Sequence, residues 1–190
     1  MDAVGLIFAC AMSVEERAAR RLGPTVRVGL GASNGVPEVD RLVSFGIAGA
    51  LRGDLPIGTV IDATRVVDED GSVLWEGGPL GVTSARAGTI LGAGRIVDDP
   101  SERARLHEQT GADAVDMESG TLARSGKLAG CIRAISDTPT SKLAGLGEAV
   151  KANGDPDVLG FVRGFARSPL ETAHAVANAR RALKSLEAVT

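Results

Sequence analysis

Residues 112–140 read ADAVDMESGTLARSGKLAGCIRAISDTPT, and they predict a strand, a helix and a second strand in close succession. Residues 112–115 and 129–135 are short apolar runs, which are typical of strands covered on both faces of a sheet. Residues 117–127 between them have the length and composition of a helix. Strands that alternate with helices in this way indicate an α/β fold.

Acidic side chains follow both apolar runs. Asp116 and Glu118 come after the first run, and Asp137 comes after the second. In α/β folds, ligands gather at the carboxyl ends of strands, where side chains leave the sheet and helix N-termini point at the ligand. These carboxylates are therefore candidates for a binding site. A structural role is the alternative, because Asp116 or Ser119 could cap the helix that begins near Met117.

The rest of the chain continues the same alternation. Ser13 is expected to cap a short first helix, and Ser101 supplies half of the usual start signal for a later one. The pattern predicts one domain over residues 1–190, with a mixed, largely parallel sheet flanked by helices and a helical C-terminal third. Further strands are predicted at 4–11, 26–30, 42–47, 59–67, 72–75, 89–91 and 95–97, and further helices at 100–109, 143–152, 157–167 and 169–188.

The last predicted helix has Pro169 in its first turn and a series of apolar residues that form its expected packing face. The series consists of Leu170, Ala173, Ala177, Ala182, Leu183 and Leu186.

Composition narrows the class of partner. The 190 residues carry a net charge of −3, with 21 basic and 24 acidic residues interleaved, so no one-signed surface for nucleic acid or an anionic membrane is expected. Four Phe, one Trp and no Tyr leave few rings on which nucleic-acid bases could stack. A small-molecule or protein partner is expected.

Cysteine usage and the first residues bear on location. Cys10 and Cys131 both lie inside apolar runs, which favours buried thiols in a reducing cytosol over a disulfide. The opening MDAVGLIFACAMS lacks Lys and Arg and is too short to cross a membrane, so it is interpreted as a buried strand rather than a signal peptide. We therefore expect a cytoplasmic protein without stable membrane insertion.

Two further loops could carry function. AMSVEE (11–16) follows the first strand and places Glu15 in the first turn of a helix, where a carboxylate more often serves only as a partner of the helix dipole. FGIAGAL (45–51) has small residues that let the backbone approach a ligand closely, although such a loop is weak evidence alone.

In combination, AMSVEE, SFGIAGAL, AVDMESGTLA and IRAISDT, in this order, resemble the signatures of the purine nucleoside phosphorylase / methylthioadenosine nucleosidase family. The resemblance spans nearly the whole chain and implies that family's three-layer α/β fold. SFGIAGAL, TGADAVDMES and the tail VLGFVRGFARSPLETAHAVANARRAL look most like the hopanoid-associated phosphorylase branch, which removes adenine from adenosylhopane.

The resemblance implies a role for each matching residue. Asp137 corresponds to the acid that protonates the leaving purine at N7, and Ser136 would orient it. Glu15 would orient or deprotonate the attacking water, with Glu16 as the alternative if the register slips by one.

Glu118 matches the carboxylate that accepts hydrogen bonds from the ribose hydroxyls, and Met117 would lie against the sugar. The glycine-rich loop would contact the substrate through Gly46, Ile47, Ala48 and Gly49.

The sequence departs from the family at the position of Ile47, where many phosphorylases have a Ser or Thr that binds phosphate. A branched alkyl group cannot donate to a phosphate oxygen, so hydrolysis is favoured over phosphorolysis. The alternative stays open because Arg27 and Arg52 could supply cationic contacts, with inorganic phosphate as co-substrate.

The chain is also short between residues 26 and 42, and LGAGRIV (91–97) lacks the aromatic ring that nucleosidases place on the base. A shortened wall would open the 5′ side of the pocket to a bulky apolar group. The same departures allow a third possibility, a non-catalytic relative that binds a nucleoside or lipid.

The family implies no cofactor, and the sequence suggests no metal, because His107 and His174 lie on separate predicted helices without ligand spacing. The expected partner is a purine nucleoside, and the resemblance implies a homodimer or higher homo-oligomer.

Overall fold

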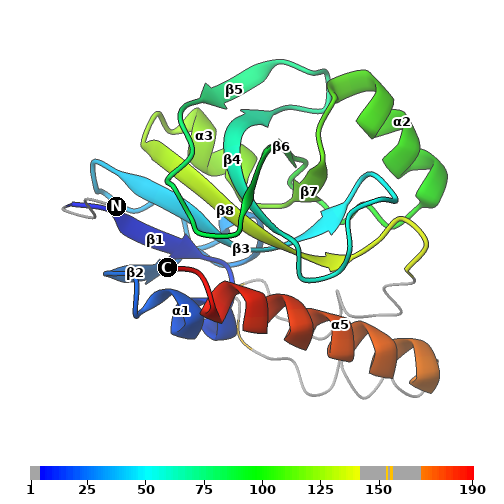
Figure 1. The fold of residues 1–190 in the computed structure, drawn as a ribbon. Helices are drawn as coiled ribbons and strands as arrows, with labels where there is room; N and C mark the ends of the chain where they lie inside the picture. The colour runs from blue at the N-terminus through cyan, green and yellow to red at the C-terminus, as the bar shows by residue number, and fades with distance from the viewer. Residues whose placement is uncertain (1–4, 142–152, 154, 156–167) are drawn as a thin grey trace.

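The computed structural model describes residues 5–141, 153, 155 and 168–190 (Figure 1). The helices predicted at 143–152 and 157–167 lie outside the described residues. The strands are β1 (Ile7–Cys10), β2 (Thr25–Arg27), β3 (Leu42–Ala50), β4 (Val60–Val67), β5 (Val73–Glu76), β6 (Arg86–Gly92), β7 (Ala114–Asp116) and β8 (Leu128–Asp137). The helices are α1 (Ser13–Ala19), α2 (Pro100–Thr110), α3 (Ser119–Arg124) and α5 (Pro169–Glu187), and Leu30–Ala32 forms a 3-10 turn, η1.

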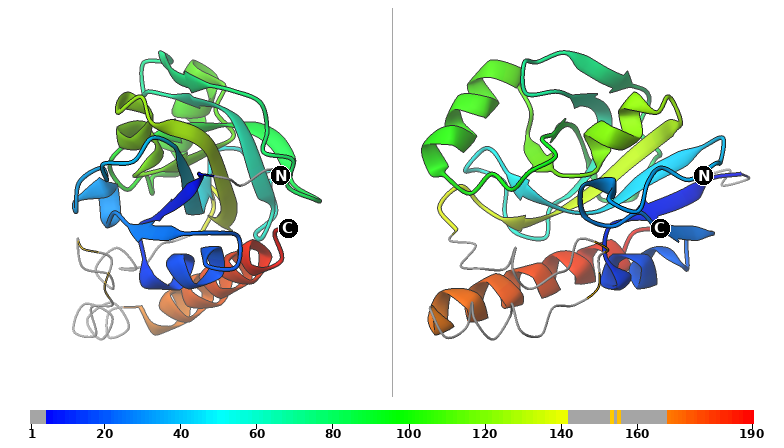
Figure 2. Two further views of the ribbon diagram at one scale, coloured as in Figure 1. Left: turned by 90° about the vertical axis from the view of Figure 1, so that its left-hand side faces the viewer. Right: turned by 180° about the vertical axis from the view of Figure 1, so that it is seen from behind.

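The described strands form one mixed sheet in the order β2-β1-β3-β7-β6-β4-β5, with β8 pairing with both β3 and β4. Neighbours are parallel in the pairs β1–β2, β1–β3, β3–β8, β4–β6 and β6–β7, and antiparallel in β3–β7, β4–β5 and β4–β8. Because β8 bridges β3 and β4, the strands β3, β7, β6, β4 and β8 close into a ring (Figure 2). The prediction of a mixed, largely parallel sheet is confirmed.

Helices lie on two sides of the sheet. Helices α1 and α5 lie together on one side, and α2 and α3 lie on the other (Figures 1 and 2). Under α1 and α5, the rings of Phe8 and Phe45 pack edge to face, with their centroids 5.8 Å apart. They belong to a buried apolar cluster that includes Ala182 and Leu186 of α5. The α/β fold flanked by helices, with a helix at the C-terminus, is confirmed.

The packing face of α5 differs from the predicted one. Ala182 and Leu186 are buried and Leu183 is partly buried, but Leu170, Ala173 and Ala177 are exposed. The helix instead buries Thr172 and Ala175 in its first half. These four buried residues lie at spacings of three, seven and four, which is one face of an α-helix. The predicted face was therefore right only in the second half of the helix, where Ala182 and Leu186 are buried.

Several predicted element boundaries are wrong. Residues 95–97 form a loop rather than a strand, because Gly94 turns the chain with a φ of 66° two residues after the end of β6. The strand predicted at 26–30 ends at Arg27 and gives way to η1.

Helix starts also differ. Met12, rather than Ser13, is the residue before α1, and Asp99, rather than Ser101, caps α2 by accepting a hydrogen bond from the Glu102 N–H at 2.8 Å. Helix α3 begins at Ser119 instead of near Met117, and Glu118 is its N-cap residue. The Asp116 carboxylate accepts the Ser119 N–H at 3.1 Å, so Asp116 satisfies a donor in the first turn without being the N-cap residue.

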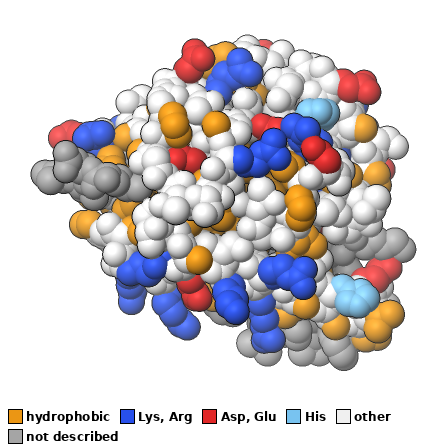
Figure 3. All heavy atoms as spheres, in the orientation of Figure 1, with side chains coloured by type: hydrophobic (Ala, Val, Ile, Leu, Met, Phe, Trp, Pro, Cys, Tyr) orange, Lys and Arg blue, Asp and Glu red, His pale blue; other side chains and the backbone are white. Residues whose placement is uncertain are grey.

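On the face shown in Figure 3, acidic and basic side chains are interspersed, with basic ones more frequent along the lower edge. Within the described residues, no helix is long and apolar enough to cross a membrane. Cys10 and Cys131 are both buried free thiols, as predicted.

Candidate active site

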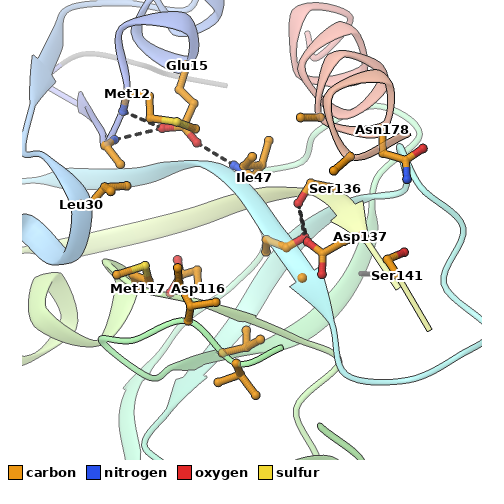
Figure 4. Close-up of a pocket in the computed structure, with 18 of the residues that line it drawn as sticks. Met12, Glu15, Leu30, Ile47, Asp116, Met117, Ser136, Asp137, Ser141 and Asn178 are labelled. Carbon is orange, nitrogen blue, oxygen red and sulfur yellow. Dashed lines mark hydrogen bonds between the residues drawn. The ribbon is translucent and has the colours of Figure 1, made fainter. Parts of the chain in front are cut away.

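A cavity of about 620 Å³ opens at the carboxyl ends of β1 and β8 and beside the last residues of β3. Its walls come from α1, β3, the loop after β6, the segment after β7, the end of β8 and one face of α5 (Figure 4). Glu15, Glu118 and Asp137, which are far apart in the sequence, all border this one cavity. So do Met117, Ser136, Ile47, Ala48 and Gly49, whereas Gly46 does not.

Glu15 is held rigidly between two elements. Its Oε2 accepts the backbone N–H groups of Ala11 at 3.0 Å and Met12 at 2.9 Å, and its Oε1 accepts that of Ile47 at 2.9 Å (Figure 4). The side chain is buried, and burial raises its pKa against the opposing effects of Arg133 and these backbone donors. Such a carboxylate is a better base than an exposed one.

Glu16 takes no part in the cavity. Its carboxylate pairs with Arg20 at 3.1 Å and with Arg27 at 3.6 Å on the outer side of α1. Of the two registers that the sequence left open, the structure therefore favours Glu15.

Glu118 lies in a buried charge network. Its Oε1 accepts the Gly31 N–H at 3.0 Å, and its Oε2 lies 3.6 Å from Arg133 Nη2. The Arg133 side chain is 1% exposed. Its Nε donates a hydrogen bond to the Asp116 carboxylate at 2.5 Å, and its Nη2 donates one to the Ser44 hydroxyl at 2.6 Å. Burial, followed by the nearby charge of Asp116, raises the pKa of Glu118 to about 8.

Asp137 ends β8 and its two carboxylate oxygens have different neighbours. Oδ2 accepts a hydrogen bond from the Ser136 hydroxyl at 2.8 Å, as Figure 4 shows. Oδ1 lies 2.5 Å from Nη2 of Arg103, an α2 side chain that is 1% exposed. The predicted relationship of Ser136 to Asp137 is thus present in the geometry.

Two glycines of β3 make room for these charged groups. A Cβ on Gly46 would lie 2.4 Å from Glu15 Oε1 and 2.5 Å from Arg133 Nη1. A Cβ on Gly49 would lie 2.8 Å from Asp137 Oδ1 and 3.0 Å from Arg103 Nη2. The glycine-rich motif therefore accommodates the acids and their arginines, and this explains why Gly46 matters to the site without facing the cavity.

Arg103 and Arg133 were not among the residues predicted for the site. Arg133 was detectable in principle, because it is the one charged residue inside the apolar run 128–135. Arg103 carried a weaker signal, its position three residues before the buried Leu106 on an otherwise polar helix. His174, which the sequence placed on a helix without metal-ligand spacing, borders the cavity from α5, together with Asn178.

The two arginines considered for phosphate binding lie elsewhere. Arg27 pairs with Glu16 and Asp155, and Arg52 pairs with Asp54 at 2.6 Å and Asp113 at 3.0 Å. Neither arginine is among the described residues that border the cavity. In the described part of the chain, no cluster of His, Cys, Asp and Glu side chains has the arrangement of a metal site.

The fold matches those of solved nucleosidases. A mutant Helicobacter pylori 5′-methylthioadenosine/S-adenosylhomocysteine nucleosidase with 5′-methylthioadenosine in its active site superposes with a TM-score of 0.53 at 17% identity, covering 95% of this chain and 96% of that one. The Neisseria meningitidis nucleosidase in complex with methylthio-immucillin-A gives a TM-score of 0.56 at 17% identity, with coverages of 95% and 97%. Futalosine hydrolase of Helicobacter pylori gives a TM-score of 0.53 at 17% identity, with coverages of 95% and 96%.

At these identities the likeness establishes the fold, which is the single-domain α/β fold of the methylthioadenosine nucleosidases. The sequence matches no protein-family model and no curated protein.

Proposed function

We propose that this protein hydrolyses the N-glycosidic bond of a purine nucleoside that has adenine as its base and an apolar 5′ substituent. The observation that carries the proposal is that Glu15, Glu118 and Asp137 border one cavity large enough for a nucleoside. Solved proteins with the same fold bind or are named for nucleoside-like molecules, which supports the same class of substrate.

The proposed reaction assigns each acid one task. Asp137 donates a proton to N7 of the purine as the bond from C1′ to N9 breaks and its electron pair moves onto the base. The water oxygen bonds to C1′, and Glu15 accepts the proton that this water loses. Glu118 accepts hydrogen bonds from the ribose hydroxyls, and these strengthen as positive charge develops on the sugar.

The charges around the cavity support hydrolysis over phosphorolysis. Phosphate carries negative charge and needs free cationic or N–H donors. Within the described residues, the two arginines at the cavity are already paired, Arg103 with Asp137 and Arg95 with Glu69 and Glu102. The Ile47 N–H is also occupied, because it donates to Glu15.

An apolar 5′ group is supported by the walls of the cavity. Ile47 of β3, Val97 after β6, and Ala175, Ala179 and Leu183 of α5 present alkyl groups to it. Adenosylhopane, the substrate suggested by the resemblance to the hopanoid-associated branch, is our specific proposal within this class.

The test is release of free adenine from a panel of adenine nucleosides with increasingly apolar 5′ groups, with and without inorganic phosphate. We expect release that is independent of phosphate and that falls by about a hundredfold or more in Asp137→Asn. Asp54→Asn, at an exposed carboxylate away from the cavity, is the matched control and should retain activity. A strict need for phosphate would indicate phosphorolysis, and binding without turnover would indicate a non-catalytic relative.

A further inference from the structure

Arg103 is an unusual residue for its helix. Helix α2 is mostly exposed, yet it buries the Arg103 side chain, whose Nε donates to the Val97 carbonyl at 2.8 Å and whose Nη1 donates to the Ala50 carbonyl at 3.1 Å. Two backbone carbonyls thus hold the guanidinium in place, and its remaining nitrogen, Nη2, points at Asp137. A buried guanidinium is costly to desolvate unless a carboxylate accompanies it.

The pair leaves the two oxygens of Asp137 unequal. Oδ1 meets Arg103 as an ion pair and accepts no directed hydrogen bond among the described residues. Oδ2 lies 2.8 Å from the Ser136 hydroxyl, which is also 3.2 Å from the Ala48 carbonyl. Since a guanidinium cannot accept a proton, the proton of a neutral Asp137 belongs on Oδ2.

We propose that Arg103 is a positioning residue for Asp137, which orients the proton onto Oδ2 and stabilises the carboxylate left when that proton passes to the departing base. This inference rests on the proposed function. The proton moves from Oδ2 to N7 of the purine, and the negative charge that remains on Asp137 faces the fixed guanidinium. The ion pair stabilises that negative charge as it forms, so the barrier to departure of the base is lowered.

The surroundings of Asp137 single out Arg103 for this role. The other charged or titratable groups at the cavity are Glu15 of α1, Arg95 before α2, Asp116 and Glu118 after β7, and Glu171 and His174 of α5. Among the described residues, Arg103 is the cation within ion-pair distance of Asp137. Gly49 of β3 provides the space in which the two side chains meet.

The experiment compares Arg103→Met, which removes the charge, with Arg103→Lys, which keeps it, and Arg105→Met, an exposed control on the same helix. We expect kcat for base release to fall by about tenfold or more in Arg103→Met with little change in KM, and to recover in part in Arg103→Lys. Circular dichroism checks folding, and Arg103→Gln is the second neutral variant should Arg103→Met fail to fold.

Two kinetic outcomes decide the proposal. Equal kcat values in the parent, Arg103→Met and Arg103→Gln would overturn it. A parent that releases no base from any nucleoside would instead defeat the proposed function.

Discussion

At the scale of single residues, the carboxyl groups of the site differ in what surrounds them. Glu15 is bound by three backbone N–H groups, Asp137 faces a guanidinium, and Glu118 shares Arg133 with Asp116. One guanidinium cannot fully compensate two buried carboxylates, and this is consistent with the raised pKa of Glu118. The site therefore holds two buried carboxyl groups, Glu15 and Glu118, whose pKa values are raised above the ordinary value.

The raised pKa of Glu118 predicts how stability depends on pH. Between its ordinary value of 4.5 and about 8, the folded protein keeps a proton on Glu118 that the unfolded chain has lost. The free energy of unfolding should therefore fall as pH rises through this window. In Glu118→Gln this contribution disappears. The difference in free energy of unfolding between the variant and the parent should therefore shift in favour of the variant from pH 5 to pH 8, by an amount on the order of a few kcal/mol.

Urea denaturation at several pH values measures the difference. Glu108→Gln, at an exposed position of α2, is the control and should follow the parent. Parallel pH profiles for the parent and Glu118→Gln would contradict the buried, protonated state of Glu118.

At the scale of elements, β3 organises the site. Its backbone N–H at Ile47 holds Glu15, and its two glycines lie against the pairs formed by Glu15 with Arg133 and by Asp137 with Arg103. Each glycine is needed for close approach rather than for an unusual backbone conformation, since neither has a positive φ.

Replacing either glycine of β3 with alanine should disturb the pair of charged side chains that lies against it. We expect Gly46→Ala to destabilise the protein by about 1–3 kcal/mol, because its Cβ would overlap two buried charged groups. Gly49→Ala should lower base release more than stability, because it displaces Asp137 and Arg103 beside the cavity. Gly53→Ala, with nothing near its Cβ, should behave as the parent in denaturation and activity assays. Normal activity and stability in both test variants would show that β3 tolerates these side chains.

Most elements were predictable because strands and helices leave local signals. The apolar run that became β8 and the Pro169 start of α5 were both located within a few residues. The predicted start of α3 was two residues early. Met117 lies before the helix and Glu118 is its N-cap residue, and both border the cavity. The motif itself did not distinguish this start from a helix that begins at Met117.

At the scale of the whole molecule, the cavity exists because the C-terminal helix α5 packs against β8 and β3 (Figure 1). Its inner face contributes His174, Ala175, Asn178, Ala179 and Leu183 to the cavity wall. Substrate selection is therefore shared between the sheet edge, which carries the acids, and a helix more than thirty residues further along the chain. A homo-oligomer stays a prediction from the resemblance, and a cytoplasmic location stays a prediction from the two cysteines and the opening residues.

Filling the cavity from α5 should block the substrate. In Ala179→Phe, a ring replaces a methyl group on the cavity wall, so we expect KM for the nucleoside to rise by about tenfold or more, a change of about 1.4 kcal/mol or more in binding. Ala177→Phe, on the exposed face of the same helix, is the matched control and should bind as the parent does. Equal KM values in the two variants would place the substrate away from α5.

The α/β class, the order of most elements and the acids that border the cavity could be predicted from the sequence, because periodicity and residues at strand ends are local properties. The partners of those acids became known only from the three-dimensional fold. Arg103 meets Asp137 from 34 residues away, and Arg133 meets Asp116 from 17 residues away. These pairs depend on which face of α2 turns inward and on how β8 lies against β3 and β7. Long-range packing sets that arrangement, and no short stretch of sequence encodes it.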